Sequence, residues 1–255
     1  MQPVLLEVGR LKIYSFGSFI ALGAIVAGTV MYQLCRLNKI TTKYLFDTVL
    51  YCLIASLIGA RLGYYLTYRD QFQSFWQVFY FWQGGLLALT GLAVGFVTYL
   101  YFLRRHQLPL WSMLDIGALG LLSGWAVGKI GCHLSTCTVG RFTDSFFAVQ
   151  ASFPLDLFSV FWAALLFIVL LTIWRHRRLS DGVIFFLSLE GFFLGELLIK
   201  TLKADFGEGL VRTEAIIYLL LVVVIYLIFW RLHGPQFERR KVGQALKNLV
   251  FRRRR

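Results

Sequence analysis

The sequence predicts an all-α integral membrane protein with about seven transmembrane helices, its N-terminus outside the cell and its C-terminus in the cytoplasm. The composition indicates this class. Of 255 residues, 58% are hydrophobic and only 15% are charged, whereas soluble globular domains are about 45–50% apolar and about 25% charged. The mean hydropathy is +0.68. Because a transmembrane helix needs about 20 apolar residues, a chain of this length holds roughly six to eight of them and no large soluble domain.

Seven apolar segments are separated by polar or aromatic connections, and we expect each to form a transmembrane helix. Residues 71–83 are rich in aromatic side chains but too short to span, so they suit the membrane interface. The first residues are not followed by a short apolar core and a small-residue cleavage site, so we expect no cleavable signal peptide. The seven expected helices cover residues 13–34, 44–68, 84–103, 110–130, 153–174, 182–202 and 215–230.

The chain is expected to divide into a seven-span membrane domain, residues 1–234, and a basic amphipathic cytoplasmic tail, residues 235–255. In the tail, Val242, Leu246 and Leu249 stand near helical spacing among basic residues. This pattern is typical of a helix lying on an anionic leaflet. A disordered solubilising tail is the alternative.

Lysine and arginine concentrate in alternate connections, and this sets the expected orientation. Cytoplasmic connections of membrane proteins carry an excess of these residues. Here they fill the first, third and fifth connections and the tail, and they are sparse in the others. We therefore place the connection after the fourth helix outside the cell. The basic residues of the three connections are Arg36, Lys39, Lys43, Arg104, Arg105, Arg175, Arg177 and Arg178.

The net charge of +13 lies mainly in connections and the tail. In a membrane protein this placement favours an anionic membrane surface as partner rather than nucleic acid. The chain has four cysteines. Only Cys132 and Cys137 are close in sequence, so the cysteines do not form the framework of a disulfide-rich fold.

The most polar end of any apolar segment is residues 124–141, GWAVGKIGCHLSTCTVGR. One interpretation is an ordinary helix end, with Gly131 and Gly140 as stop signals. We favour a functional site, because Lys129 falls inside or at the edge of the hydrocarbon, where an ionisable group is costly.

Cys132, His133 and Cys137 are candidate catalytic residues in the same stretch. Their spacing matches no standard zinc pattern, so we expect no metal. It also differs from the CxxC spacing of a redox motif. A thiol activated by an imidazole is a further interpretation, although neighbouring side chains on a helix point in different directions. Structural packing of small cysteines and an interfacial histidine is the alternative for each.

Charged residues in two other segments are candidates for lipid binding. Arg61 and Lys129 are expected near the outer ends of their helices, in glycine-rich sequence that permits close helix contact, where two cations would hold a lipid phosphate. The alternative is that each long side chain simply extends to water. Glu196 and Lys200 stand at i and i+4, on one helix face. They are either functional or a self-neutralising pair that eases insertion.

Several motifs together resemble the prolipoprotein diacylglyceryl transferase family, over nearly the whole chain. The motifs are GARLGYYLTY at 59–68, WQGG at 82–85, GKIGCHLSTCTVGR at 128–141, FPLDLF at 153–158 and GELLIKTLKAD at 195–205. The resemblance implies seven spans and transfer of diacylglycerol from phosphatidylglycerol to the lipobox cysteine of a preprolipoprotein. It also implies the outer leaflet of the bacterial plasma (inner) membrane, and no cofactor. On this basis Arg61, Lys129, Gly140 and Arg141 are candidate lipid-binding residues.

The chain departs from this family at its acid–base positions. The family histidine falls at Leu89, and the signature arginine and asparagine are Lys129 and Cys132. The acidic residue of the signature falls at Cys137, and the family's sixth-span arginine and glutamate fall at Glu196 and Lys200. The FPLDLF motif resembles His-Pro-x-Gln-Leu-Tyr, with phenylalanine in place of the histidine.

Three functions remain open at this stage. The first is a lipid transferase with substituted catalytic residues. The second is a catalytically inactive homologue that binds phospholipid or lipoprotein precursors. The third is a small-molecule transporter that uses the charges of the sixth helix; the lack of an evident inverted repeat counts against it.

Overall fold

The fold is known from a computed structural model, which describes residues 4–8, 11–69, 85–135, 137, 154–176, 180–201 and 215–231. The described residues form seven helices and one short hairpin, so the expected all-α membrane fold is confirmed. The helices are α1 (Ser15–Leu37), α2 (Leu45–Thr67), α3 (Ala88–Arg105), α4 (Leu110–Ser135), α5 (Leu155–His176), α6 (Val183–Thr201) and a C-terminal helix, Ala215–Arg231. Of these, α1, α2, α4 and α5 are each long and apolar enough to cross a membrane.

The outer surface of the bundle is apolar, as a lipid-facing surface must be. Leu66, Val97 and Phe161 are all more than half exposed. Monomeric soluble proteins rarely expose large contiguous apolar patches. The chain is therefore a multi-pass membrane protein, which agrees with the hydropathy of its helices.

The first helix begins two residues later than expected, because a β-hairpin precedes it. Strands β1 (Val4–Val8) and β2 (Leu11–Tyr14) pair antiparallel, so residues 13 and 14 belong to a strand and not to the helix. Apolar and polar residues alternate over only a few positions here, and an isolated two-stranded hairpin is marginally stable. The local pattern was therefore too weak to predict it.

The fourth helix runs five residues beyond its expected end. Gly131 lies inside α4, and the polar connection expected from that residue starts later. A Cβ at Gly131 would lie 2.5 Å from the Phe19 Cβ and 3.3 Å from the Ser15 carbonyl oxygen. This glycine permits close packing against α1 and does not stop the helix.

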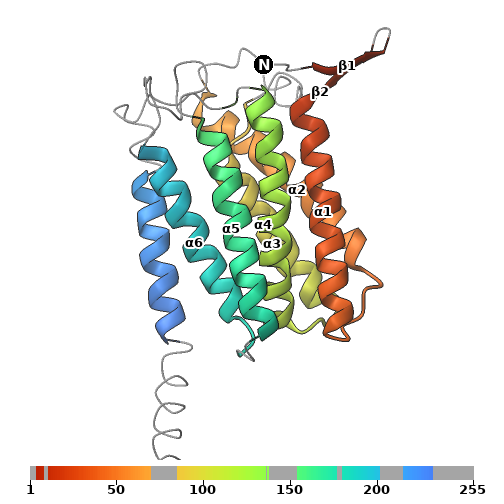
Figure 1. The fold of residues 1–255 in the computed structure, drawn as a ribbon, viewed down its shortest axis with the longest axis vertical. Coiled ribbons are helices and arrows are strands. Elements are labelled where there is room, and N and C mark those ends of the chain that lie inside the picture. The colour runs from red at the N-terminus through yellow and green to blue at the C-terminus, as the bar shows by residue number, and fades with distance from the viewer. Residues whose placement is uncertain are drawn as a thin grey trace, which may run out of the picture.

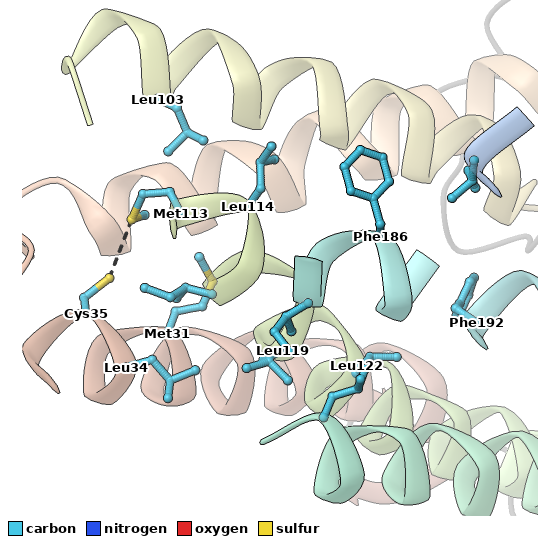
Figure 2. Packing of buried hydrophobic residues seen from close by; sticks show 14 of the residues in the cluster. Met31, Leu34, Cys35, Leu103, Met113, Leu114, Leu119, Leu122, Phe186 and Phe192 are labelled. Atoms are coloured by element: carbon cyan, nitrogen blue, oxygen red, sulfur yellow. Dashed lines mark hydrogen bonds between the residues drawn. The ribbon is translucent and has the colours of Figure 1, made fainter. Parts of the chain in front are cut away.

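Helix α4 is the centre of the bundle, packed against α1, α5 and α6, while α2 packs mainly against α3 (Figure 1). The largest buried side chains gather around the first half of α4. Figure 2 shows Cys35 of α1 pointing at Met113 of α4, with an Sγ–Sδ distance of 3.8 Å. Leu103 of α3 and Ile184 of α6 complete this layer.

Contacts between helix ends establish that neighbours in sequence run in alternate directions. At one end, the Tyr44 and His106 rings stack 4.0 Å apart, joining the start of α2 to the end of α3. The Asp115 carboxylate of α4 accepts hydrogen bonds from the Gly182 and Phe185 amides at the start of α6, at 2.8 and 2.7 Å. This is the basic end of the bundle, which we define by Arg36, Lys39, Lys43, Arg104 and Arg105.

The gathering of basic residues at one end agrees with the expected alternation of connections (Figure 1). The candidate site residues that the structure describes lie towards the opposite end of the bundle, where α2 and α4 finish and α3 and α5 begin. Residues 235–255, the predicted amphipathic tail, lie outside the described residues.

Candidate functional site

Lys129 forms the centre of a charged cluster at the end opposite the basic end. Its Nζ lies 3.3 Å from Oδ1 of Asp156, which joins α4 to the first turn of α5. Side-chain exposure is 16% for Lys129 and 3% for Asp156. The Lys129 ammonium also lies 5.6 Å from the centre of the Trp125 ring, one helical turn earlier, within the range of a cation–π contact.

A second carboxylate lies near this cation. Glu196 of α6 is buried and lies within electrostatic range of Lys129. Three helices therefore bring one cation and two carboxylates together. Lys200 belongs to the last turn of α6, and its side chain lies outside the described part of the chain, so the predicted Glu196–Lys200 pair stays a prediction.

The three candidate catalytic residues of the α4 stretch lie beside this cluster. Cys132 and His133 are half-buried in the last turn of α4, and Cys137 is exposed just beyond it. The Cys137 amide donates to the Cys132 carbonyl oxygen at 3.1 Å, and the neighbouring Cys132 thiol lowers the pKa of the Cys137 thiol. Within the described residues, no three metal-ligating side chains come together.

Arg61 occupies a separate position on α2. It is 2% exposed and donates from Nη1 to the Gly85 carbonyl oxygen at 3.1 Å. Gly85 has a φ of +74°, and a Cβ there would lie 2.6 Å from the Tyr64 ring. Arg61 thus helps to fix the turn that starts α3.

The glycines beside Arg61 and Lys129 do not bring α2 and α4 together. A Cβ at Gly59 would meet Val94 of α3 at 2.6 Å, and Gly63 faces Thr90 of the same helix. Gly131 faces α1, as described above. The expectation that these glycines allow the two cation-bearing helices to approach is wrong, and the shared phosphate site of Arg61 and Lys129 stays a prediction. Gly140 and Arg141 lie outside the described residues.

The structure adds Asp156 and Trp125 to the candidate site. The sequence offered one signal for Asp156, since it occupies the polar position of the FPLDLF motif. Without a structure, an acid in a first helical turn is explained equally well as a cap. Trp125 carried no signal, because aromatic residues are common in membrane helices.

Comparison with known proteins identifies the family. The family model described as prolipoprotein diacylglyceryl transferase matches residues 3–231. The chain belongs to this family. Members of the prolipoprotein diacylglyceryl transferase family in several bacteria show the extent of the similarity.

Three relatives are named phosphatidylglycerol–prolipoprotein diacylglyceryl transferase. The protein of Halalkalibacterium halodurans is 30% identical, over 94% of this chain and 90% of its own length. That of Oceanobacillus iheyensis is 25% identical, over 91% and 88%. That of a Synechocystis strain is 23% identical, over 94% of both chains.

Leu89, near which the resemblance places the family's histidine, is packed against the hydrophobic core near the start of α3. The next residue, Thr90, donates from Oγ1 to the Leu87 carbonyl oxygen at 2.9 Å. An apolar side chain at this position cannot exchange a proton. In this member of the prolipoprotein diacylglyceryl transferase family, the buried carboxylates described towards the end opposite the basic end are Asp156 and Glu196, near Lys129.

Proposed function

We propose that this protein transfers diacylglycerol from phosphatidylglycerol to the lipobox cysteine of a prolipoprotein, at the outer leaflet of a bacterial plasma membrane. The observation that carries the proposal is the family match, which extends over residues 3–231. The names of the relatives, which match nearly the whole chain, support the same reaction. The partners are then an anionic phospholipid and the extended lipobox segment of a second protein.

The charged cluster is proposed to hold the phosphate of the lipid. Lys129 is a described cation towards the end of α4, and an ammonium attracts a phosphodiester oxygen as a point charge. Asp156 keeps the Lys129 side chain in place through the 3.3 Å ion pair. Arg61 and Arg141 are the other basic side chains proposed at this end, and Glu196, Lys200 and Gly140 complete the proposed lipid site.

The reaction requires a proton acceptor, and Leu89 cannot supply one. The lipobox thiol loses its proton, its sulfur bonds to the glyceryl carbon of the lipid, and the bond from that carbon to the phosphate oxygen breaks. Glycerol phosphate leaves and takes up the proton. We propose Asp156 or Glu196 as the group that carries this proton, because these are the buried carboxylates next to the phosphate-binding cation and general acid–base groups must lie within reach of the reacting atoms.

Cys132, His133 and Cys137 are proposed to support this site rather than to carry the lipid. A diacylglyceryl group on a protein thiol would be a thioether, and a thioether does not release its carbon group to a second thiol. A covalent intermediate on Cys137 would therefore stop the enzyme.

A second candidate function is a homologue that binds phospholipid without turnover. The observation that favours it is Leu89, an apolar residue where the family has its histidine. This candidate shares the proposed lipid site and differs only in chemistry, so one experiment separates the two.

The test uses the full-length protein in lipid nanodiscs with labelled phosphatidylglycerol and a lipobox peptide. The proposed function predicts a peptide that carries diacylglycerol in thioether linkage, with a lower kcat for Asp156→Asn or Glu196→Gln. It predicts phosphatidylglycerol binding that is about tenfold to a hundredfold weaker for Arg61→Ala and Lys129→Ala, because a hydrogen bond to a charged group contributes roughly 1.5–3 kcal/mol. Lys129→Arg keeps binding, since guanidinium also grips phosphate.

The two candidate functions predict different results in this experiment. Saturable binding of phosphatidylglycerol without product supports the non-catalytic homologue. Failure of both binding and turnover in the folded protein contradicts both functions.

A further inference from the structure

A backbone hydrogen bond folds Cys137 back onto the last turn of α4. The helix runs to Ser135, and the Cys137 amide donates to the Cys132 carbonyl oxygen at 3.1 Å, five residues earlier. A bond of this span is one of the bonds that satisfy the last carbonyl groups of a helix. The two residues that this bond brings together are both cysteines.

Both cysteines are free in this structure, and the backbone hydrogen bond holds them close together. The neighbouring Cys132 thiol is the main cause of a lowered pKa for the Cys137 thiol. Because Cys137 is also exposed, it is the thiol of the pair that reacts first with a disulfide in solution.

The pair lies at the end of the bundle opposite the basic end. The positive residues predict that this end faces outward. Disulfides persist on the outer side of a bacterial plasma membrane, whereas cytoplasmic thiols stay reduced. The pair is therefore predicted to meet oxidants that the buried Cys35, at the basic end, does not meet.

We infer that Cys132 and Cys137 form a reversible disulfide that closes the end of α4. The oxidant is a disulfide compound, protein or small molecule, that exchanges with thiols. The Cys137 thiolate attacks one sulfur of that disulfide and displaces its first thiolate. Cys132 then attacks Sγ of Cys137 and displaces the second. The protein loses two hydrogens as its disulfide forms, and the oxidant leaves as a dithiol or as two thiols.

The disulfide would act beside the charged cluster. Lys129 interacts electrostatically with Cys132, and Asp156 with both cysteines. Oxidation removes the thiol protons and pins Cys137 to the last turn of α4, next to the Lys129–Asp156 pair. The inference rests on the backbone hydrogen bond that joins the two free cysteines, and it does not depend on the proposed function.

The experiment equilibrates the full-length protein, purified in detergent, with buffers of oxidised and reduced dithiothreitol. The protein is then denatured in acid, its free thiols are alkylated with a maleimide, and each cysteine peptide is identified by mass. We expect the oxidised protein to show alkylated Cys35 and Cys52, and a Cys132–Cys137 peptide that carries no label and has lost two hydrogens. Reduced dithiothreitol should return two labelled thiols to that peptide.

Matched variants establish the pairing. Cys52→Ser removes a cysteine of α2 and should leave the disulfide unchanged, whereas Cys137→Ser should keep Cys132 open to alkylation in every buffer. The amide of Cys137 should also exchange its hydrogen more slowly in the oxidised parent than in the reduced one. Full alkylation of Cys132 and Cys137 in the oxidised buffer would overturn the inference, and so would labelling of Cys132 alone with a mixed disulfide on Cys137.

Discussion

At the scale of single residues, the main feature is one cation that is paired with one carboxylate and lies near a second from another helix. Lys129 pairs with Asp156 at 3.3 Å and interacts electrostatically with the buried Glu196. Removing one partner of a buried ion pair is costly because the other charge is left without compensation. The three groups are therefore not equivalent: loss of the cation removes the described ion-pair partner of Asp156 and a positive charge near Glu196, whereas loss of Asp156 leaves the cation near Glu196.

We predict that Lys129→Met destabilises the protein by about 3–5 kcal/mol, the range found when a buried pair is broken. Asp156→Asn should cost clearly less, because Lys129 retains Glu196. Unfolding of both variants by denaturant in detergent micelles measures the difference. Asp181→Asn is the matched control, because this acid is exposed. The hydrogen bond described for its carboxylate is the one that it accepts from the Ser112 hydroxyl, at 2.6 Å. Equal losses for Lys129→Met and Asp156→Asn would show that Glu196 does not share the cation.

At the scale of elements, glycines decide which helices pack together. A Cβ at Gly23 of α1 would lie 2.6 Å from the Gly124 carbonyl oxygen of α4, and a Cβ at Gly124 would lie 2.7 Å from the Gly23 carbonyl oxygen. The two backbones touch at this point. In a membrane the lipid is as apolar as the side chains, so close backbone packing supplies much of the force that joins helices.

We predict that Gly23→Ala lowers stability by about 1–3 kcal/mol, because the added methyl group overpacks the contact between α1 and α4. Gly17→Ala on the same helix is the control, since no atom lies within 4 Å of a Cβ there. Alanine is intrinsically better than glycine in a helix by up to about 1 kcal/mol, so the control should be neutral or stabilised. Thermal unfolding in detergent compares the two variants. A similar gain in thermal stability for Gly23→Ala and Gly17→Ala would mean that α1 and α4 do not approach this closely in the folded protein.

At the scale of the whole molecule, the two ends of the bundle differ in charge. Arg36, Lys39, Arg104 and Arg105 gather at one end, and the Lys129 cluster lies towards the other. Basic residues stay on the cytoplasmic side during insertion. The predicted orientation would place the proposed lipid site at the outer leaflet, and it is the premise on which the outward position of Cys137 rests.

We predict that a membrane-impermeant maleimide labels Cys137 in intact cells after mild reduction. Ser180→Cys, made together with Cys137→Ser, should react only after the cells are permeabilised, because Ser180 begins the connection into α6 at the basic end. The two positions act as reporters for opposite ends. Labelling of Ser180→Cys from outside, with Cys137 protected, would reverse the orientation.

The sequence by itself determined the helices, their alternating directions and the family. The length of an apolar run can be read from each segment of the sequence alone. The expected helices therefore agree with the observed ones to within a few residues at most ends. The errors fell at the hairpin, where the strands are short, and at Gly131, where a glycine serves packing and not helix termination. The family followed from motifs that are local in sequence.

Only the tertiary structure decided which side chains meet. Asp156 and Glu196 reach Lys129 because α5 and α6 pack beside α4, and Arg61 turns to Gly85 because α3 packs on α2. Helix neighbours in a membrane are hard to infer from sequence, since lipid-facing and protein-facing surfaces are both apolar. The hydrogen bond from the Cys137 amide to the Cys132 carbonyl oxygen depends likewise on the chain folding back onto the end of α4.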